Sequence, residues 1–170
     1  MRASEVFSFP NPVNEKAARV VAGGVVVLAA VTLATQWFWL LIPLAYGFVA
    51  RVSTGPTLSP LGQLATRVVA PRLGAPRLVA GPPKRFAQGM GAAITVAAAV
   101  VWFGFGLELP TVVLLALIVV AATLESVFAF CIGCRVFAVL MRFGVVPEAV
   151  CEECNDITLR QAYTGATTQR

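Results

Sequence analysis

The four cysteines of this 170-residue chain form two pairs, and they are the residues best suited to chemistry. The pairs are Cys131 with Cys134 and Cys151 with Cys154. Their spacing, C-x2-C-x16-C-x2-C, is typical of zinc sites built from four thiolates. A CxxC pair can also serve as a thiol–disulfide or sulfur-relay centre. Structural zinc, a redox or relay centre, and four reduced cysteines without a special role all remain open.

The chain contains no histidine, which narrows the remaining chemistry. Bis-histidine haem, a histidine general base and a Ser-His-Asp triad are excluded. Glu125 is the other notable group, because an ionisable residue within an apolar run is costly and is a functional candidate. It could fix helix packing as a protonated or hydrogen-bonded glutamate, or relay protons or bind an ion. Transport ranks last, since transporters normally carry more than one such group.

The composition places these residues in an integral membrane protein. Apolar residues make up 58% of the chain and charged residues 12%, against a usual charged share of about 25%. Uncharged stretches cover 20–50, 86–107 and 109–124. One membrane span requires about 20 apolar residues. The first stretch is too long for one span and slightly short for two, so its length alone does not set the number of spans.

The positions of the cations decide the number of spans. Six Lys or Arg residues and no acid occur from Arg51 to Arg85, so this segment should remain cytoplasmic. Cations also precede the first apolar stretch and follow the last one, as Arg19 and Arg135 illustrate. Three basic segments on one side require an even number of spans. We therefore predict an all-α, polytopic membrane protein with four transmembrane helices arranged as two hairpins. The alternative is one tilted span at 20–42 and three spans in all, which would carry the six-cation segment across the membrane.

The predicted transmembrane domain covers residues 1–143. Its spans are expected at about 12–34, 37–52, 84–105 and 110–134, with a cytoplasmic loop at 53–83. Ser59 and Pro60 should begin a short amphipathic helix of that loop, which would lie in the membrane interface. A CxxC tail at 144–157 should fold back on the fourth helix, and 158–170 should be a flexible C-terminus. Both termini would be cytoplasmic, on a multi-pass protein of the plasma membrane.

The basic loop offers a second candidate site. Its cations could bind anionic lipid or dock a soluble partner, at about 1 kcal/mol per residue near an anionic surface. Setting the topology is an equally good explanation of their presence. The residues concerned are Arg67, Arg72, Arg77, Lys84 and Arg85. The bilayer is the expected partner, homo- or hetero-oligomers remain open, and no nucleic-acid partner is expected.

Three short segments of the chain resemble a known family. PRLG at 71–74, PPKRFAQ at 82–88 and CIGC at 131–134 are similar to a bacterial family of small integral membrane proteins of unknown function. The second CxxC pair resembles the actinobacterial members. The resemblance covers about residues 10–157 and implies a four-helix membrane fold. It also implies frequent gene neighbours of the thioredoxin-like and rhodanese-type sulfurtransferase classes, which favours thiol or sulfur chemistry.

We therefore predict a membrane component of thiol redox or sulfur metabolism. Its cytoplasmic centre, Cys131 and Cys134, would act with a soluble thioredoxin-like or sulfurtransferase partner. Whether this chain is itself an enzyme stays open, with a lean towards no. The alternative is a structural or scaffold protein whose four cysteines bind zinc, and a small transporter ranks third. No haem is expected.

Overall fold

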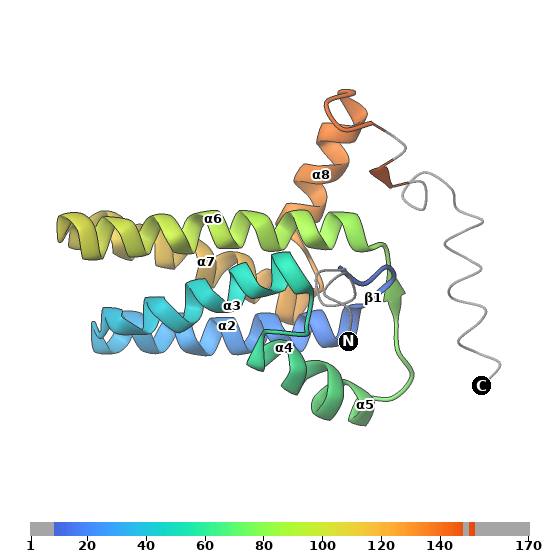
Figure 1. Cartoon of the computed structure of the whole chain (residues 1–170), viewed down its shortest axis with the longest axis horizontal. Coiled ribbons are helices and arrows are strands. Elements are labelled where there is room, and N and C mark those ends of the chain that lie inside the picture. The colour runs from blue at the N-terminus through green and yellow to red at the C-terminus, as the bar shows by residue number, and fades with distance from the viewer. Residues whose placement is uncertain (1–8, 148–149, 152–170) are drawn as a thin grey trace.

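The computed structural model describes residues 9–147 and 150–151. Its main body is a set of helices that run side by side (Figure 1). These helices are α2 (Glu15–Thr35), α3 (Leu41–Thr54), α6 (Gly81–Phe105) and α7 (Glu108–Phe128). Among them α2, α6 and α7 are long and apolar enough to cross a membrane, whereas the apolar segment Phe38–Thr54 is shorter. The chain thus has the helices that a membrane protein requires.

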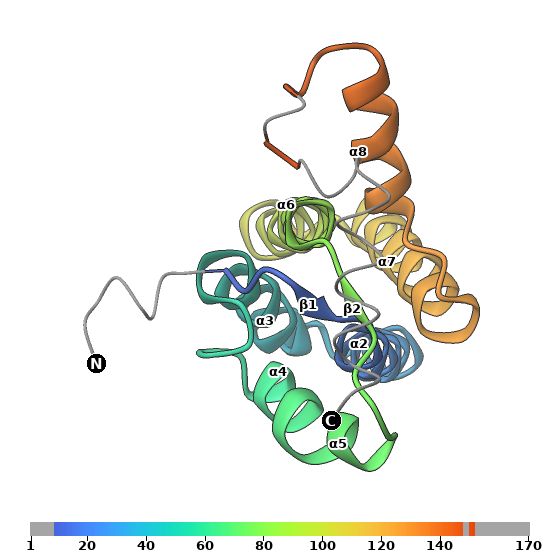
Figure 2. The same cartoon turned by 90° about the vertical axis from the view of Figure 1, so that its right-hand side faces the viewer.

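The helices pack around a common centre, as the view along the bundle shows (Figure 2). Helix α2 packs on α7, α3 packs on α6, and α6 packs on α7. Small and aliphatic side chains fill the interior, and Ala29, Leu41 and Leu115 are fully buried. Large apolar side chains such as Leu109 also cover the outside. An apolar exterior around a tight interior suits a bundle whose solvent is lipid.

Aromatic rings join the helices at one end of the bundle, where α2 turns into α3 and α6 into α7. A short 3-10 helix, η1 (Phe38–Leu40), precedes α3. The ring centroids of Phe38 and Trp102 are 4.1 Å apart, and those of Trp39 and Phe103 are 5.2 Å apart. Tryptophan rings prefer the membrane interface. This end of the bundle therefore has the side chains expected at a bilayer surface.

The central loop lies at the opposite end of the bundle (Figure 1). It forms one helical segment made of α4 (Pro60–Leu64), the π-helical η2 (Ala65–Val69) and α5 (Ala70–Arg72). Ser59 caps it by accepting a hydrogen bond from the Gly62 amide, as the sequence predicts. The connector that follows includes strand β2 (Leu78–Val79), which pairs antiparallel with β1 (Val13–Asn14).

The helix bounds differ from the predicted spans, most of all in the fourth. The predicted span 110–134 is divided, because α7 ends at Phe128 and a separate helix, α8 (Ile132–Arg142), follows. Helix α8 leaves the bundle and packs on α6 (Figures 1 and 2). Helix α6 also begins earlier than the predicted position 84, at Gly81, because the two prolines that follow Gly81 suit a first helical turn.

Candidate functional site

Cys131 and Cys134 lie at the start of α8. Cys131 is the N-cap residue, with extended backbone angles, and Cys134 belongs to the first turn. The first amides of a helix lack intrahelical partners and favour negative charge nearby. Both cysteines are free thiols, with Cys131 buried and Cys134 half-buried. A CxxC pair at a helix N-terminus is an arrangement that activates a thiol.

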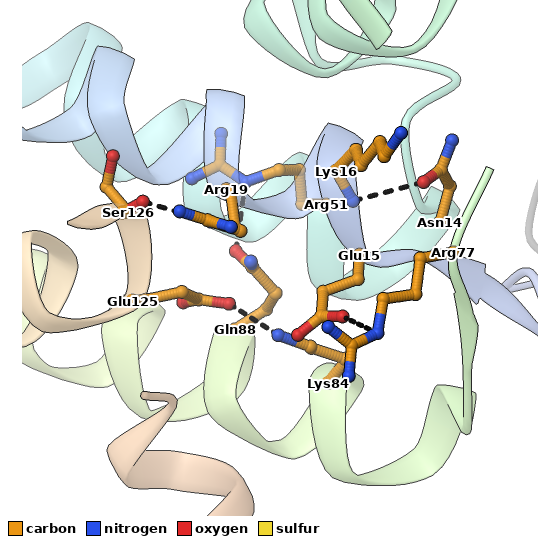
Figure 3. A network of polar contacts seen from close by, with 10 residues as sticks. All are labelled: Asn14, Glu15, Lys16, Arg19, Arg51, Arg77, Lys84, Gln88, Glu125 and Ser126. Atoms are coloured by element: carbon orange, nitrogen blue, oxygen red, sulfur yellow. Dashed lines mark hydrogen bonds and ion pairs between the residues drawn. The ribbon is translucent and has the colours of Figure 1, made fainter. Parts of the chain in front are cut away.

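Arg19 stabilises the interruption between α7 and α8, which lies just before Cys131. Ala129 adopts a left-handed conformation, with φ of 55°, and ends α7. Arg19 of α2 donates hydrogen bonds to the carbonyl of Ser126 at 3.0 Å (Figure 3) and to the carbonyl of Val127 at 3.1 Å. The last carbonyls of a helix have no amide of their own helix to accept from. Arg19 therefore fixes the end of α7 and the loop that follows it. That loop leads to Cys131 and Cys134, which together are called the dithiol below.

Gly133 lets α8 begin close against α6. A Cβ atom added at Gly133 would lie 2.5 Å from both Cα and Cβ of Ala87, so only glycine fits without a shift. One turn further on, Phe137 is buried and its ring centroid lies 5.6 Å from that of Phe86. The glycine of the CIGC motif thus has a packing role, because it seats the dithiol against the bundle.

Lys84 of α6 and Glu125 of α7 form an ion pair beside the dithiol. Lys84 Nζ and Glu125 Oε1 are 2.7 Å apart, with side chains 10% and 15% exposed (Figure 3). Buried charges are stable only when paired, so each residue needs the other. The sequence predicts Glu125 as a functional candidate because its neighbours are apolar. It predicts Lys84 only as one of the cations of the central loop. The structure places Lys84 in the bundle interior, where it is not available to lipid headgroups.

The two thiols differ in acidity. A hydrogen bond from the Cys134 thiol lowers the pKa of Cys131, and the charge of Lys84 acts in the same direction, against burial and Glu125. The pKa of Cys134 is raised, because its hydrogen bond to Cys131 and its burial both favour the protonated form. Cys131 is therefore the thiol that more readily carries negative charge, and Cys134 is the one that keeps its proton.

A cavity of about 230 Å³ extends from Cys131 into the bundle. Side chains of α2, α3, α6 and α7 form most of its wall, which is apolar. Four lining residues can provide polar side-chain groups, namely Arg51, Gln88, Glu125 and Cys131. The cavity thus brings the more acidic thiol together with an arginine, an amide and a carboxylate inside an otherwise apolar space.

Arg51 is a functional candidate that the sequence does not single out. It lies in the last turn of α3 and is only 6% exposed. Its Nε donates to Gln88 Oε1 at 2.9 Å (Figure 3), its Nη1 donates to Ser59 Oγ at 3.3 Å, and its Nη2 is buried without a hydrogen-bond partner. The one available signal is that Arg51 ends an uncharged run, but sequence position does not show which way the side chain faces.

The other cations that the sequence assigns to the loop lie away from Cys131, Cys134 and the Lys84–Glu125 ion pair. Arg67 and Arg72 are exposed on the loop helix. Arg77 pairs with Glu15 at 2.9 Å (Figure 3), and Arg85 donates to the carbonyl of Val52 at 3.1 Å. Contact of these exposed cations with lipid or with a soluble partner stays a prediction.

The second cysteine pair is only partly within the described residues. Cys151 is 3% exposed and disulfide-bonded. Cys154 lies outside the described residues, as do the predicted C-terminus 158–170 and most of the predicted tail. Within 9–147 and 150–151, no group of three or more Cys, Asp or Glu side chains could hold a metal ion. The zinc site needs all four thiolates and therefore stays a prediction.

Comparison with known proteins bears on the family and not on an activity. No significant match is found among curated proteins or among solved structures. The predicted membership of a family of unknown function is confirmed, whereas the motif segments and the actinobacterial likeness stay predictions. The family model described as "Domain of unknown function (DUF4395)" matches residues 13–142, which include the first CxxC pair, the Lys84–Glu125 ion pair and Arg51, and the chain belongs to this family.

Proposed function

We propose that this protein is a membrane-embedded thiol–disulfide redox component that works with a soluble dithiol partner of the thioredoxin-like or sulfurtransferase class. One observation carries the proposal. The first CxxC pair forms the start of α8, with Cys131 as the N-cap and both thiols free. A position at a helix N-terminus beside a lysine is where a cysteine becomes a good thiolate.

The difference between the two thiols gives them separate roles. In the oxidised protein, a partner thiolate attacks the sulfur of Cys134, which is the more exposed of the two. The Cys131–Cys134 bond breaks, and Cys131 leaves as the thiolate, because a thiol of lower pKa is the better leaving group. The partner's second thiol then attacks the mixed disulfide and releases Cys134, which regains a proton. The partner loses two electrons and two protons. The CxxC pair gains both electrons and, at Cys134, one proton, and the other proton passes to the solvent.

The experiment is a thiol titration of the full-length protein in lipid nanodiscs, together with its metal content. We expect that, after the Cys131–Cys134 pair has been oxidised to a disulfide, reduction by a soluble thioredoxin-type dithiol protein produces two new thiols, at Cys131 and Cys134. The double variant Cys151→Ser/Cys154→Ser is the matched control and should cycle equally well. Stoichiometric zinc with four protected thiols would overturn the proposal in favour of the scaffold alternative. A pair that never exchanges with dithiols would also overturn it.

We also propose that the chain crosses the plasma membrane four times, with the dithiol and both termini on the cytoplasmic side. The segment Phe38–Thr54 is short, but at 1.5 Å per residue it reaches roughly 25 Å, close to the hydrocarbon thickness of a thin bilayer. The central loop and α8, which begins at Cys131, lie at the same end of the bundle (Figure 1). A basic end is expected to face the cytoplasm, where a soluble reducing partner is available.

A further inference from the structure

We propose that the cavity beside Cys131 binds the ring of a lipid-soluble quinone, which takes the two electrons that the dithiol receives. This inference rests on the proposed redox function and names the membrane-side acceptor. A dithiol that is reduced by a soluble partner needs an oxidant before it can react again. The quinone class is inferred from the cavity's walls, its opening and its polar groups.

The walls of the cavity favour a neutral, apolar ligand. Most lining side chains are aliphatic, and all of these except Ile132 come from helices long enough to span a membrane. Leu117 lines the cavity and is also 53% exposed on the outer surface of α7, so the space extends to the lipid-facing side. The volume, about 230 Å³, is below the range of about 300–1,000 Å³ typical of drug-sized pockets. It suits a substituted ring whose long tail remains in the bilayer.

Arg51 supplies a hydrogen-bond donor for such a ring. It is 94% buried by residue area, since only 6% is exposed, and Nη2 has no partner in the structure. A buried donor without an acceptor is costly. A quinone carbonyl is an uncharged acceptor that an arginine can bind inside an apolar wall. The carboxylate of Glu125, which also lines the cavity, disfavours a small free anion at the same place.

The dithiol lies where the electrons must be transferred. Cys131 lines the cavity, and Cys134 follows it one helical turn later on the more exposed side. In the step we propose, the bond between the two sulfurs forms, the Cys131 thiolate and the Cys134 thiol give up two electrons, Cys134 loses its proton, and the second proton of the quinol comes from water. The quinone accepts two electrons and two protons, and its two carbonyls become the hydroxyls of the quinol. The quinol returns to the bilayer, and the disulfide is ready for the next partner dithiol.

The test uses the reduced full-length protein in nanodiscs and a benzoquinone with a decyl tail as the probe. Absorbance measures quinol formation, and alkylation with mass spectrometry measures thiols lost. We expect one quinol per Cys131–Cys134 disulfide. Arg51→Leu should raise the half-saturating quinone concentration about tenfold, by loss of the donor. Cys134→Ser should form no quinol catalytically, because no disulfide can close.

A second variant guards against misfolding of the arginine variant. Ala121→Leu fills the cavity from α7, and Ala116→Leu adds the same atoms to the exposed face of the same helix. We expect Ala121→Leu to lower quinol formation about tenfold or more and Ala116→Leu to leave it unchanged. Equal rates in these two variants would overturn the cavity assignment, because the quinone would then react elsewhere.

Dithiol exchange without quinone is measured in the same samples. Normal exchange with no quinol formation in the wild-type protein would overturn the quinone inference and leave the proposed function intact. Loss of exchange itself would instead contradict the proposed function. The two failures are therefore distinguishable.

Discussion

At the residue scale, a lysine, a glutamate and two cysteines from three helices act on one another. Lys84 offsets the charge of Glu125, and both influence Cys131. Cys131 and Cys134 are chemically identical and three positions apart, yet their pKa values shift in opposite directions. The difference arises from position, because one sulfur accepts a hydrogen bond from the other at the start of a helix.

The first prediction concerns the pH dependence of alkylation. A lowered pKa keeps the Cys131 thiolate populated until the pH falls through that value, whereas Cys134 becomes a thiolate only at higher pH. We expect iodoacetamide to modify Cys131 with a lower pH midpoint than Cys134, as measured by mass spectrometry of the Cys151→Ser/Cys154→Ser protein. Lys84→Gln should move the Cys131 midpoint upwards. A higher midpoint for Cys131 than for Cys134 would contradict the assignment of roles.

The second prediction concerns the stability of the ion pair. Lys84→Met leaves the buried carboxylate of Glu125 without its partner, which should cost about 3 kcal/mol. The double variant Lys84→Met/Glu125→Met removes both charges and should recover most of that loss. Thermal unfolding in one detergent compares the three proteins. A double variant no more stable than Lys84→Met would show that the unpaired carboxylate of Glu125 is not the cause of the loss.

At the element scale, the beginning of α8 decides where the dithiol lies. Arg19 binds the last carbonyls of α7, Ala129 ends that helix in a left-handed conformation, and Gly133 lets α8 pack closely against α6. If α7 continued without a break, Cys131 would be an interior residue of a helix, where its sulfur would lose the nearby free amides of a helix start. The break between α7 and α8 is therefore part of the site.

The third prediction tests this packing. Gly133→Ala places a methyl group against the backbone of Ala87, so α8 must shift, at a cost of about 1–3 kcal/mol. We expect slower exchange of Cys134 with a soluble dithiol and a lower unfolding temperature. Gly89→Ala is the matched control on α6, because an added Cβ meets nothing within 4 Å there. Equal effects of the two substitutions would argue against the seating role of Gly133.

At the scale of the whole molecule, the two ends of the bundle differ: the turns that join α2 to α3 and α6 to α7 lie at one end, and the loop helix and α8 lie at the other (Figure 1). The aromatic end has the turns with Trp39 and Phe103, and the basic end holds the loop helix and α8. The cavity connects the second end with the apolar interior. This arrangement would allow one site to meet a soluble partner and a lipid-soluble one.

The fourth prediction concerns orientation. A membrane-impermeant maleimide should fail to label Cys134 in intact cells and should label it in inverted vesicles, because a basic end is retained in the cytoplasm. A cysteine placed at Gly106, in the turn between α6 and α7, should show the opposite pattern. The control is the same labelling after detergent treatment, in which both positions react. Labelling of Cys134 from outside would reverse the proposed topology.

Some of the site could be predicted from the sequence because it depends on local spacing. The CIGC motif identifies the dithiol, and Glu125 is conspicuous within an apolar run. The partner of Glu125 could not be predicted, since Lys84 is 41 positions away and looks like one of several loop cations. The role of Arg51 could not be predicted either, because its inward orientation depends on how α3 packs on α6.

The sequence by itself determined the membrane class and family of this protein and where its reactive residues lie along the chain. Composition and motif spacing carry that information, since they depend on residues close together in the chain. Only the tertiary structure decided that α7 stops before Cys131, that Lys84 faces inwards and that Arg51 lines a cavity with the dithiol. These features arise where helices distant in sequence meet, and their side chains must then be paired or packed because water is excluded.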